Sequence, residues 1–302
     1  MKSSFLAHGK VILIGEHSVV YGMNALAMPI TALHIKADVE KSDETWMNTA
    51  KYHGPFFKAP NNYDGLKYVV KTMMTLANSQ DPVKLTYTGE IPMERGFGSS
   101  ATVALATVKA MDEFYQLNLS ETKIMEITNH AETINHGKAS GLDAATVNSD
   151  YLVFFNKEDG PKKLEEKLNA TLLIMDTGEL GNTKEAVGMV RKQLETNIDA
   201  NKKIERLGEL ADLTMDSWHK QDRKTIGQYF NEAEDILASF GLATERINQL
   251  QKIALNNGAL GFKLSGGGLG GIVLALCDNK KTAKKIASES SSLINGYWIE
   301  EI

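Results

Sequence analysis

Residues 92–101 read Pro92-Met93-Glu94-Arg95-Gly96-Phe97-Gly98-Ser99-Ser100-Ala101, between a predicted strand and a strongly patterned helix. Glycines let the backbone turn tightly, and the first helical turn offers unpaired N–H groups and a positive dipole end to an anion. One serine could cap the helix while the other reaches a phosphate-bound magnesium ion. An ordinary strand-to-helix turn with a serine cap is the alternative, and the spacing of a Walker A loop is absent. We call residues 92–101 the phosphate loop, a candidate site for a chain of phosphates.

Charged residues lie at both ends of a short apolar strand near the start of the sequence. Lys10 precedes the apolar run that ends at Ile14, and Glu16 and His17 follow it. Binding residues often lie where a rigid element passes into a loop. Taken alone, Lys10 is better explained as a solvated surface lysine and His17 as a hydrogen-bonded histidine.

Two carboxylates flank a glycine-containing turn farther along. Glu132 and His136 are four residues apart, so they share one face of a predicted helix, and Asp143 follows the turn. One carboxylate could hold a divalent ion while the other orients a hydroxyl group. Acidic surface residues are the alternative for each of them alone.

Residues 265–271 contain five glycines and lie between two predicted strands. A dinucleotide-binding fingerprint needs a helix after its glycines, and a strand at 272–276 stands there instead. This context excludes the fingerprint. A flexible hairpin, or a loop packed closely against a substrate or phosphate, remains.

The composition is that of a globular protein. The 302 residues are 42% hydrophobic and 24% charged, enough for two domains. A net charge of -5 removes the attraction that drives non-specific nucleic-acid binding. The single Cys277 allows no disulfide or zinc cluster, and neither a signal peptide nor an apolar run of about 18 to 20 residues occurs. We expect a cytoplasmic protein with no nucleic-acid partner and no membrane contact.

Hydrophobic periodicity predicts alternating strands and helices. The predicted strands cover residues 10–14, 32–40, 83–88, 151–155, 172–176, 262–265, 272–276 and 297–302. The predicted helices cover 65–78, 102–115, 120–137 and 280–293, with four more between 183 and 257 that are separated near Asp199, Gln221 and Gly241. The polar segment 156–169 is a candidate domain boundary, with a solvated hairpin or loop as its alternative.

Taken together, residues 9–22, the phosphate loop, residues 140–143 and residues 265–271 resemble the motif set of the galactokinase, homoserine kinase, mevalonate kinase and phosphomevalonate kinase (GHMP) superfamily. Their order and spacing match over nearly the whole chain. Residues 15–22 and 136–143 are most similar to mevalonate kinases. Galactokinases carry an acidic residue soon after the Glu-His pair, where this chain has Val19-Val20.

The resemblance implies an α+β fold of two domains. Residues 1–168 would form an N-terminal nucleotide-binding kinase domain with a left-handed βαβ crossover. Residues 169–302 would form a helix-rich, ferredoxin-like C-terminal domain. ATP and the active site would lie in the cleft between them.

The resemblance also implies an activity, the ATP-dependent phosphorylation of the primary hydroxyl of mevalonate to 5-phosphomevalonate, in isoprenoid precursor synthesis. Asp143 would act as general base or orienting group, and Lys10 would lower the hydroxyl pKa and steady the transferred phosphoryl group. Ser100 and Glu132 would ligate Mg²⁺. The ATP phosphates would contact Pro92, Arg95, Gly96, Phe97, Gly98, Ser99, Ser100 and Ala101. The alcohol would contact Glu16, His17, Thr183 and Gly267.

Three departures from the family pattern concern loop positions and the orientation of the substrate. His8 replaces a usual proline, Phe97 a usual leucine, and Lys138-Ala139 a common Asn-Pro. The sequence leaves two other functions open, a kinase for phosphomevalonate or another alcohol and a non-catalytic ATP-binding sensor. It also leaves open whether the chain forms a homodimer.

Overall fold

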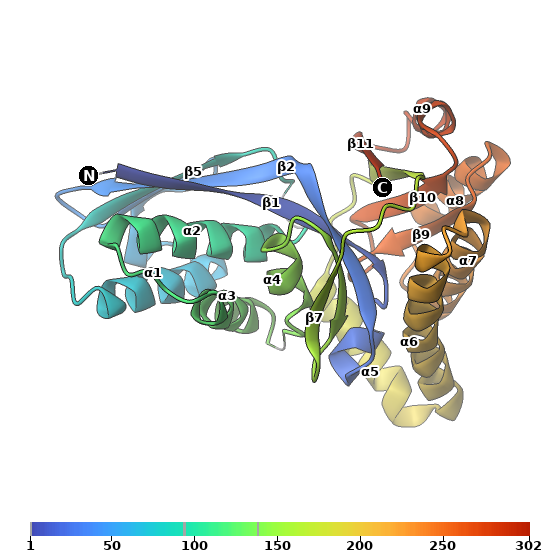
Figure 1. Ribbon diagram of the computed structural model, residues 1–302, viewed down its shortest axis with the longest axis horizontal. Helices are drawn as coiled ribbons and strands as arrows, with labels where there is room; N and C mark the ends of the chain where they lie inside the picture. The colour runs from blue at the N-terminus through green and yellow to red at the C-terminus, as the bar shows by residue number, and fades with distance from the viewer. Residues whose placement is uncertain (1, 93–94, 138) are drawn as a thin grey trace. The chain divides into compact units, whose positions relative to one another are not determined.

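A computed structural model describes residues 2–92, 95–137 and 139–302 and shows a mixed α+β chain (Figure 1). The described residues divide into two compact units. The first unit contains residues 2–10, 29–92 and 98–150, apart from residue 138. The second contains residues 11–28, 95–97 and 151–302.

The larger sheet has seven strands within the described residues, in the order β4-β3-β5-β2-β6-β7, with β1 paired to β2. The strands are β1 (Lys2–Ile14), β2 (Ala25–Lys41), β3 (Trp46–Asn48), β4 (His53–Pro55), β5 (Val83–Gly89), β6 (Leu152–Asn156) and β7 (Gly160–Leu164). In the first unit, residues 35–41 of β2 pair antiparallel with β5, and β3 pairs parallel with β5. In the second unit, residues 25–27 of β2 pair with β6. Ile35, Ala37 and Val39 are buried, which confirms the predicted two-residue alternation.

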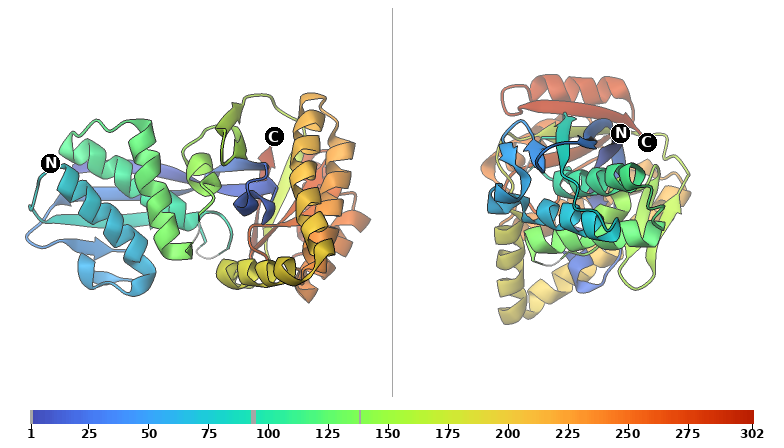
Figure 2. Two further views of the ribbon diagram at one scale, coloured as in Figure 1. Left: turned by 90° about the horizontal axis from the view of Figure 1, so that it is seen from below. Right: turned by 90° about the vertical axis from the view of Figure 1, so that its left-hand side faces the viewer.

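The helices of the first unit lie together below its strands (Figures 1 and 2). They are α1 (Asp64–Leu76), α2 (Ser99–Tyr115), α3 (Glu121–His136) and the short α4 (Leu142–Val147). The buried residues of α1 recur at helical spacing, and the side chains of Val69, Val70 and Met73 are fully buried. Ser3 Oγ on β1 donates to the carbonyl oxygen of Ala110 on α2, at 2.6 Å. This contact and the apolar core fix α2 relative to β1, which positions both elements for the site.

The second unit is built on a four-stranded antiparallel sheet in the order β11-β8-β10-β9. Its strands are β8 (Thr171–Asp176), β9 (Gly261–Ser265), β10 (Ile272–Cys277) and β11 (Gly296–Glu301). Its helices are α5 (Thr183–Thr196), α6 (Ile198–His219), α7 (Arg223–Ser239), α8 (Glu245–Asn256) and α9 (Lys280–Glu289). Every residue of β8, β9 and β10 is buried. A Cβ atom at Gly261 would collide with the backbone of Gly227, so these glycines let α7 pack directly on β9.

Most of the described helices have a side-chain N-cap. Ser120 caps α3, because its side chain accepts a hydrogen bond from the backbone N–H of Lys123. Asn182, Asn197, Asp222, Thr244 and Asn279 do the same for α5 to α9. The start of α2 differs, since it follows Gly98 and has no side-chain cap.

The structure confirms most predicted elements and corrects several of their bounds. The first strand begins at Lys2 and the last helix ends at Glu289 rather than at residue 293. Residues 156–169 contain β7, which pairs with β6, so the hairpin alternative describes the first part of this segment. The sequence patterns missed β3, β4 and α4, because strands of three residues and a helix of six residues, less than two turns, are too short to repeat an apolar face.

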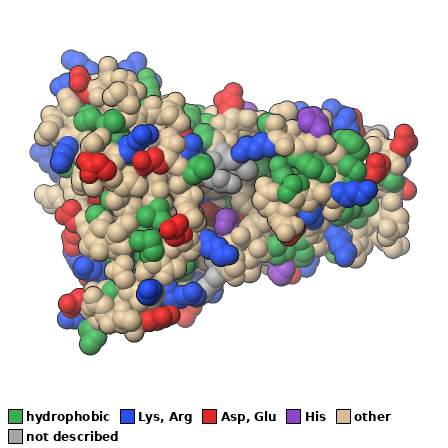
Figure 3. All heavy atoms as spheres, turned by 180° about the vertical axis from the view of Figure 1, so that it is seen from behind, with side chains coloured by type: hydrophobic (Ala, Val, Ile, Leu, Met, Phe, Trp, Pro, Cys, Tyr) green, Lys and Arg blue, Asp and Glu red, His purple; other side chains and the backbone are tan. Residues whose placement is uncertain are grey.

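The surface carries both signs of charge. Acidic and basic side chains are interspersed on the face shown in Figure 3, consistent with the small net charge of -5. Among the described helices, none combines the length and the apolar composition that crossing a bilayer requires. Cys277 on β10 is buried and forms no disulfide.

Candidate active site

An ion pair between β1 and α4 lies at the centre of the site in the first unit. Lys10 Nζ is 3.0 Å from Asp143 Oδ1, and the side chains are 3% and 35% exposed. Ser140 Oγ accepts the backbone N–H of Leu142 at 3.2 Å, which fixes the start of α4 just before Asp143. The sequence-predicted Lys10 and Asp143 are therefore brought together.

Gly98 gives the Lys10 side chain its space. A Cβ atom at Gly98 would lie 2.7 Å from Lys10 Cε, so any other residue would force the lysine side chain to shift. Gly98 also has φ 70, in the left-handed region that favours glycine. The glycine at this position of the phosphate loop thus serves both the turn and the lysine.

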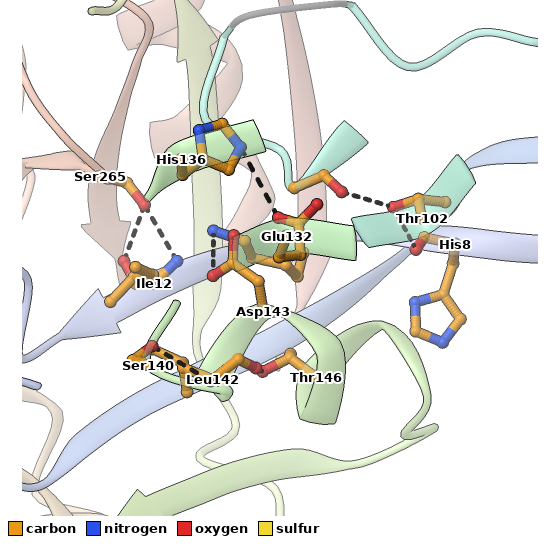
Figure 4. Close-up of polar contacts among 12 residues, drawn as sticks. His8, Ile12, Thr102, Glu132, His136, Ser140, Leu142, Asp143, Thr146 and Ser265 are labelled. Atoms are coloured by element: carbon orange, nitrogen blue, oxygen red, sulfur yellow. Dashed lines mark hydrogen bonds and ion pairs between the residues drawn. The ribbon is translucent and has the colours of Figure 1, made fainter. Parts of the chain in front are cut away.

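Glu132 on α3 is the second carboxylate of the site. Its side chain is 6% exposed, and Oε1 has no hydrogen-bond partner among the described residues. Burial and, to a smaller extent, the charge of Asp143 raise the pKa of Glu132, a hydrogen bond from Ser100 and the charge of Lys10 oppose the rise, and the resulting pKa is about 7. Figure 4 shows Glu132 and Asp143 close together, with His136 Nε2 at 3.7 Å from Glu132 Oε2. Burial lowers the pKa of His136, which leaves its ring largely neutral at pH 7.

Asn135 orients the serine that was predicted to reach the metal. Asn135 Nδ2 donates to Ser100 Oγ at 2.7 Å, and Asn135 Oδ1 accepts the backbone N–H of Gly65 at 3.1 Å. The sequence interpretation did not include Asn135. The sequence could have indicated Asn135 as a site residue, because it lies three residues after Glu132 and shares its helix face.

The phosphate loop leads directly into α2. Ser99 and Ser100 lie inside the first turn of α2, and the residue before the helix is Gly98. The expectation that a serine caps this helix is therefore wrong, because glycine in the left-handed conformation takes the cap position. The side chain of Ala101 is fully buried against the core. Residues 93–94 of the loop, and Lys138 before Asp143, lie outside the described residues.

Residues 95–97 of the phosphate loop pack within the second unit. Arg95 Nε is 3.6 Å from Asp176 Oδ1 at the end of β8. Phe97 is fully buried and meets the ring of Trp298 edge-on, with the centroids 4.9 Å apart. Phe97, which replaces a usual leucine of the family, is thus a core residue of the second unit.

The residues predicted to contact the alcohol also lie in the second unit. His17 Nε2 is 2.9 Å from the carbonyl oxygen of Gly267, which can only accept, so His17 carries its proton on Nε2. A Cβ atom at Gly267 would lie 3.0 Å from Thr183 Oγ1, which places Thr183 beside the glycine hairpin. Burial lowers the pKa of His17, so the ring is neutral at pH 7. His17, Thr183 and Gly267 form one cluster with Glu16, whose carboxylate accepts from Lys263.

Comparisons with known proteins agree with this architecture. The model of the GHMP kinases N terminal domain matches residues 66–149, and the model of the GHMP kinases C terminal region matches residues 201–292. The mevalonate kinase of Pyrococcus furiosus is 30% identical over 334 residues, which cover 100% of this chain and 99% of the relative.

Solved structures give the same picture. The crystal structure of mevalonate kinase from methicillin-resistant Staphylococcus aureus MRSA252 is 28% identical with a TM-score of 0.75, covering 99% of this chain and 98% of that chain. The L. major mevalonate kinase in complex with R-mevalonate has a TM-score of 0.80 at 22% identity, covering 98% and 94%, and shows the shared fold. These matches show that the chain belongs to the GHMP kinases, a family of ATP-dependent enzymes.

Proposed function

We propose that this enzyme transfers the terminal phosphoryl group of ATP to the primary hydroxyl of mevalonate, giving 5-phosphomevalonate. The observation that carries the proposal is the ion pair of buried Lys10 with partly exposed Asp143, beside the buried Glu132. Full-length identity of 30% to the mevalonate kinase of Pyrococcus furiosus supports mevalonate as the alcohol.

The unequal exposure of the ion pair supports distinct roles for its two members. Asp143 is 35% exposed, so its carboxylate is accessible to a hydroxyl group, which it would orient or deprotonate. Lys10 is 3% exposed and held by Asp143, so its charge is fixed where it can stabilise the transferred phosphoryl group. Both groups act by positioning and charge rather than by a covalent step.

The residues of the first unit fit a magnesium ion. Among the described residues, Glu132 Oε1 is buried without a hydrogen-bond partner, and burial raises the pKa of this carboxyl group to about 7, so a nearby cation would favour its charged form. Within the described residues, no group of three or more His, Cys, Asp or Glu side chains forms a metal cluster. Mg²⁺ commonly uses one or two protein ligands and completes its shell with phosphates and waters. We infer that Ser100 and Glu132 would hold Mg²⁺, which when bound would neutralise charge on the ATP phosphates.

The start of α2 supports phosphate binding by the residues around it. The N–H groups of Ser99, Ser100 and Ala101 lie in the first helical turn, where the dipole favours an anion. Pro92 and residues 95–98 would shape the loop around the phosphates. Arg95 Nη1 is buried without a hydrogen-bond partner among the described residues, so it has donors left for an anion.

Glu16, His17, Thr183 and Gly267 would form the part of the site that recognises the alcohol. The support is that Thr183 and His17 both contact Gly267 and that Glu16 precedes His17. A neutral His17 with Nε2–H bound to Gly267 leaves Nδ1 as an acceptor for a substrate hydroxyl.

Finer features of the fold stay predictions. The parallel pair β3–β5 with α1 between them supplies a βαβ unit for the left-handed crossover. The antiparallel β11-β8-β10-β9 sheet supports a ferredoxin-like domain. The proposed bounds of 1–168 and 169–302 separate β1 to β7 from β8 to β11. A cytoplasmic location also stays a prediction.

The test is an ADP-release assay with mevalonate, phosphomevalonate, homoserine and galactose as alternative acceptors. We expect Mg²⁺-dependent turnover with mevalonate, and none after Asp143→Asn. Turnover only with another acceptor would contradict the substrate, and tight ATP binding without turnover of any acceptor would favour a nucleotide sensor.

A further inference from the structure

Strand β9 carries a buried lysine that the proposed chemistry does not use. The Lys263 side chain is fully buried, and its Nζ donates to Glu16 Oε1 and to the carbonyl oxygen of Leu264, the latter at 2.6 Å. The same Nζ lies 5.9 Å from the centroid of the Phe230 ring. A buried charge is stable only when it is paired, and the Glu16 carboxylate forms the ion pair with buried Lys263.

Among the described residues, Lys263, Ser265 and Gly267 of the β9–β10 hairpin each contact residues 12–17. Ser265 Oγ donates to the carbonyl oxygen of Ile12 at 2.9 Å and accepts its N–H at 3.0 Å (Figure 4). His17 Nε2 donates to the Gly267 carbonyl at 2.9 Å. Lys263 and Ser265 are two residues apart on a strand, so they point to the same face. The hairpin therefore holds the end of β1 together with Glu16 and His17.

His17 needs such support because its backbone is in a disfavoured conformation. Its φ is 61, a value that non-glycine residues adopt when surrounding contacts impose it. Glu16 precedes it directly, and its carboxylate is anchored by Lys263. Releasing that anchor removes the contact that fixes the direction of the chain as it enters His17.

We propose that Lys263 is a positioning residue for the alcohol: by binding Glu16, it holds the Glu16–His17 segment in the conformation that recognises the substrate. The inference rests on the proposed function, which assigns Glu16 and His17 to the alcohol. Lys263 itself does not touch the reacting atoms.

A second buried carboxylate near Lys263 supplies a matched control. Glu234 on α7 is 1% exposed, and its Oε2 accepts the backbone N–H of Leu264 at 2.6 Å. Glu234 thus holds the backbone of β9 rather than the Glu16 side chain. Glu234→Gln keeps an acceptor for Leu264, so it should leave the KM for the alcohol unchanged.

The experiment measures KM for mevalonate and for ATP in Lys263→Met, Glu16→Gln and the double variant. Loss of a charged hydrogen bond should raise the KM for mevalonate in Lys263→Met about tenfold or more, with the KM for ATP within about twofold of wild type. Because Lys263 acts through Glu16, the double variant should bind mevalonate no more weakly than Glu16→Gln alone. A wild-type KM for mevalonate in Lys263→Met, or a further loss in the double variant, would overturn the proposal.

The double variant also covers a failure to fold. Lys263→Met leaves the Glu16 carboxylate buried without its cation and is expected to be destabilised, whereas the double variant removes both charges. If Lys263→Met does not yield folded protein, the comparison of the double variant with Glu16→Gln still decides the question.

Hydrogen exchange gives a readout that is independent of the substrate. The backbone N–H groups of Ser18 and Val19 are bonded to the carbonyl oxygens of Glu16 and Gly15, at 2.7 and 3.2 Å. Lys263→Met, or the double variant in its place, should speed exchange over residues 15–22 and leave α9 unchanged. Faster exchange in an enzyme that does not phosphorylate mevalonate would contradict the proposed substrate and support the anchoring role. Unchanged exchange in an enzyme that does would overturn the anchoring role.

Discussion

Lys10 Nζ lies 3.0 Å from Asp143 Oδ1, and the lysine is almost fully buried while the aspartate is partly exposed. The pair therefore has a fixed member and an accessible one. A cation held in this way loses little freedom when a charged group is transferred beside it, which is how preorganised charges stabilise a transition state.

Lys10→Met should lower kcat by about 100-fold to 1,000-fold, because it removes a preorganised charge and keeps the length of the side chain. The coupled ADP-release assay measures this. Lys67→Met is the control, since Lys67 forms an ion pair of similar length, 2.8 Å, with Asp64 on the surface of α1. A kcat within threefold of wild type for Lys10→Met, with about equal effects of both variants, would show that Lys10 has no role in the transfer.

Glu132→Gln should change how stability depends on pH. Because the folded pKa of about 7 lies above the unfolded value of 4.5, the metal-free wild type loses stability as pH rises between these values, and the loss is complete above pH 7. The variant has no such proton, so it should be more stable than wild type by up to about 3 kcal/mol above pH 7 and similar near pH 4.5. Urea unfolding in a chelator, across this pH range, measures the difference.

A second experiment measures how much Mg²⁺ stabilises the wild type and Glu132→Gln. Added Mg²⁺ with a non-hydrolysable ATP analogue should stabilise the wild type more than Glu132→Gln, because only the carboxylate gains a compensating cation. Parallel pH curves for the two proteins without metal, or equal stabilisation with it, would count against a metal at Glu132.

Gly98→Ala should lower both stability and kcat. The new Cβ atom would lie 2.7 Å from Lys10 Cε and would displace the lysine. The left-handed backbone conformation would lower the free energy of unfolding of the alanine variant by a further amount of about 1–2 kcal/mol. Gly160→Ala is the control, because Gly160 also has a positive φ, 77, but nothing lies within 4 Å of its Cβ position. Unfolding curves and kcat should separate the two, with about a tenfold lower kcat only for Gly98→Ala. An equal kcat in both variants would contradict the role given to Gly98.

Phe97→Ala should destabilise the protein by about 3–5 kcal/mol, because it empties a fully buried site against Trp298. Phe97→Leu, the usual family residue, should cost less than about 1.5 kcal/mol. Phe57→Ala serves as the control, since Phe57 is 48% exposed and should change stability by about 0.5 kcal/mol. Urea unfolding measures all three. Similar losses for Phe97→Ala and Phe57→Ala would show that Phe97 is not a core residue.

Periodicity predicted the long elements because their buried faces repeat regularly. The helix at 65–78 and the strand at 32–40 are examples, found as α1 (Asp64–Leu76) and as the second half of β2 (Ala25–Lys41). The prediction that Lys10 lies near Asp143 came from the family resemblance alone, because 133 residues separate them in the sequence. Local patterns carry no information about such contacts.

The sequence interpretation did not predict the contacts of Lys263 and Asn135, because their partners are distant in the sequence. Lys263 and Glu16 are 247 residues apart, and their pairing depends on how β9 packs near the end of β1. A lysine within the otherwise apolar Phe262-Lys263-Leu264 was the available signal, since a charge in a fully buried strand requires a partner. A short element such as α4 contains no comparable sequence feature that would have predicted it.

The uncapped start of α2 would give the phosphates proposed to bind there a structural role. Where α3 and α5 to α9 complete their first turns with their own side chains, α2 begins at a glycine and leaves those donors to whatever anion arrives. A phosphate bound there would act as the helix's missing end group. Loading the enzyme should therefore slow amide exchange in the first turn of α2, so that substrate binding also finishes a piece of secondary structure.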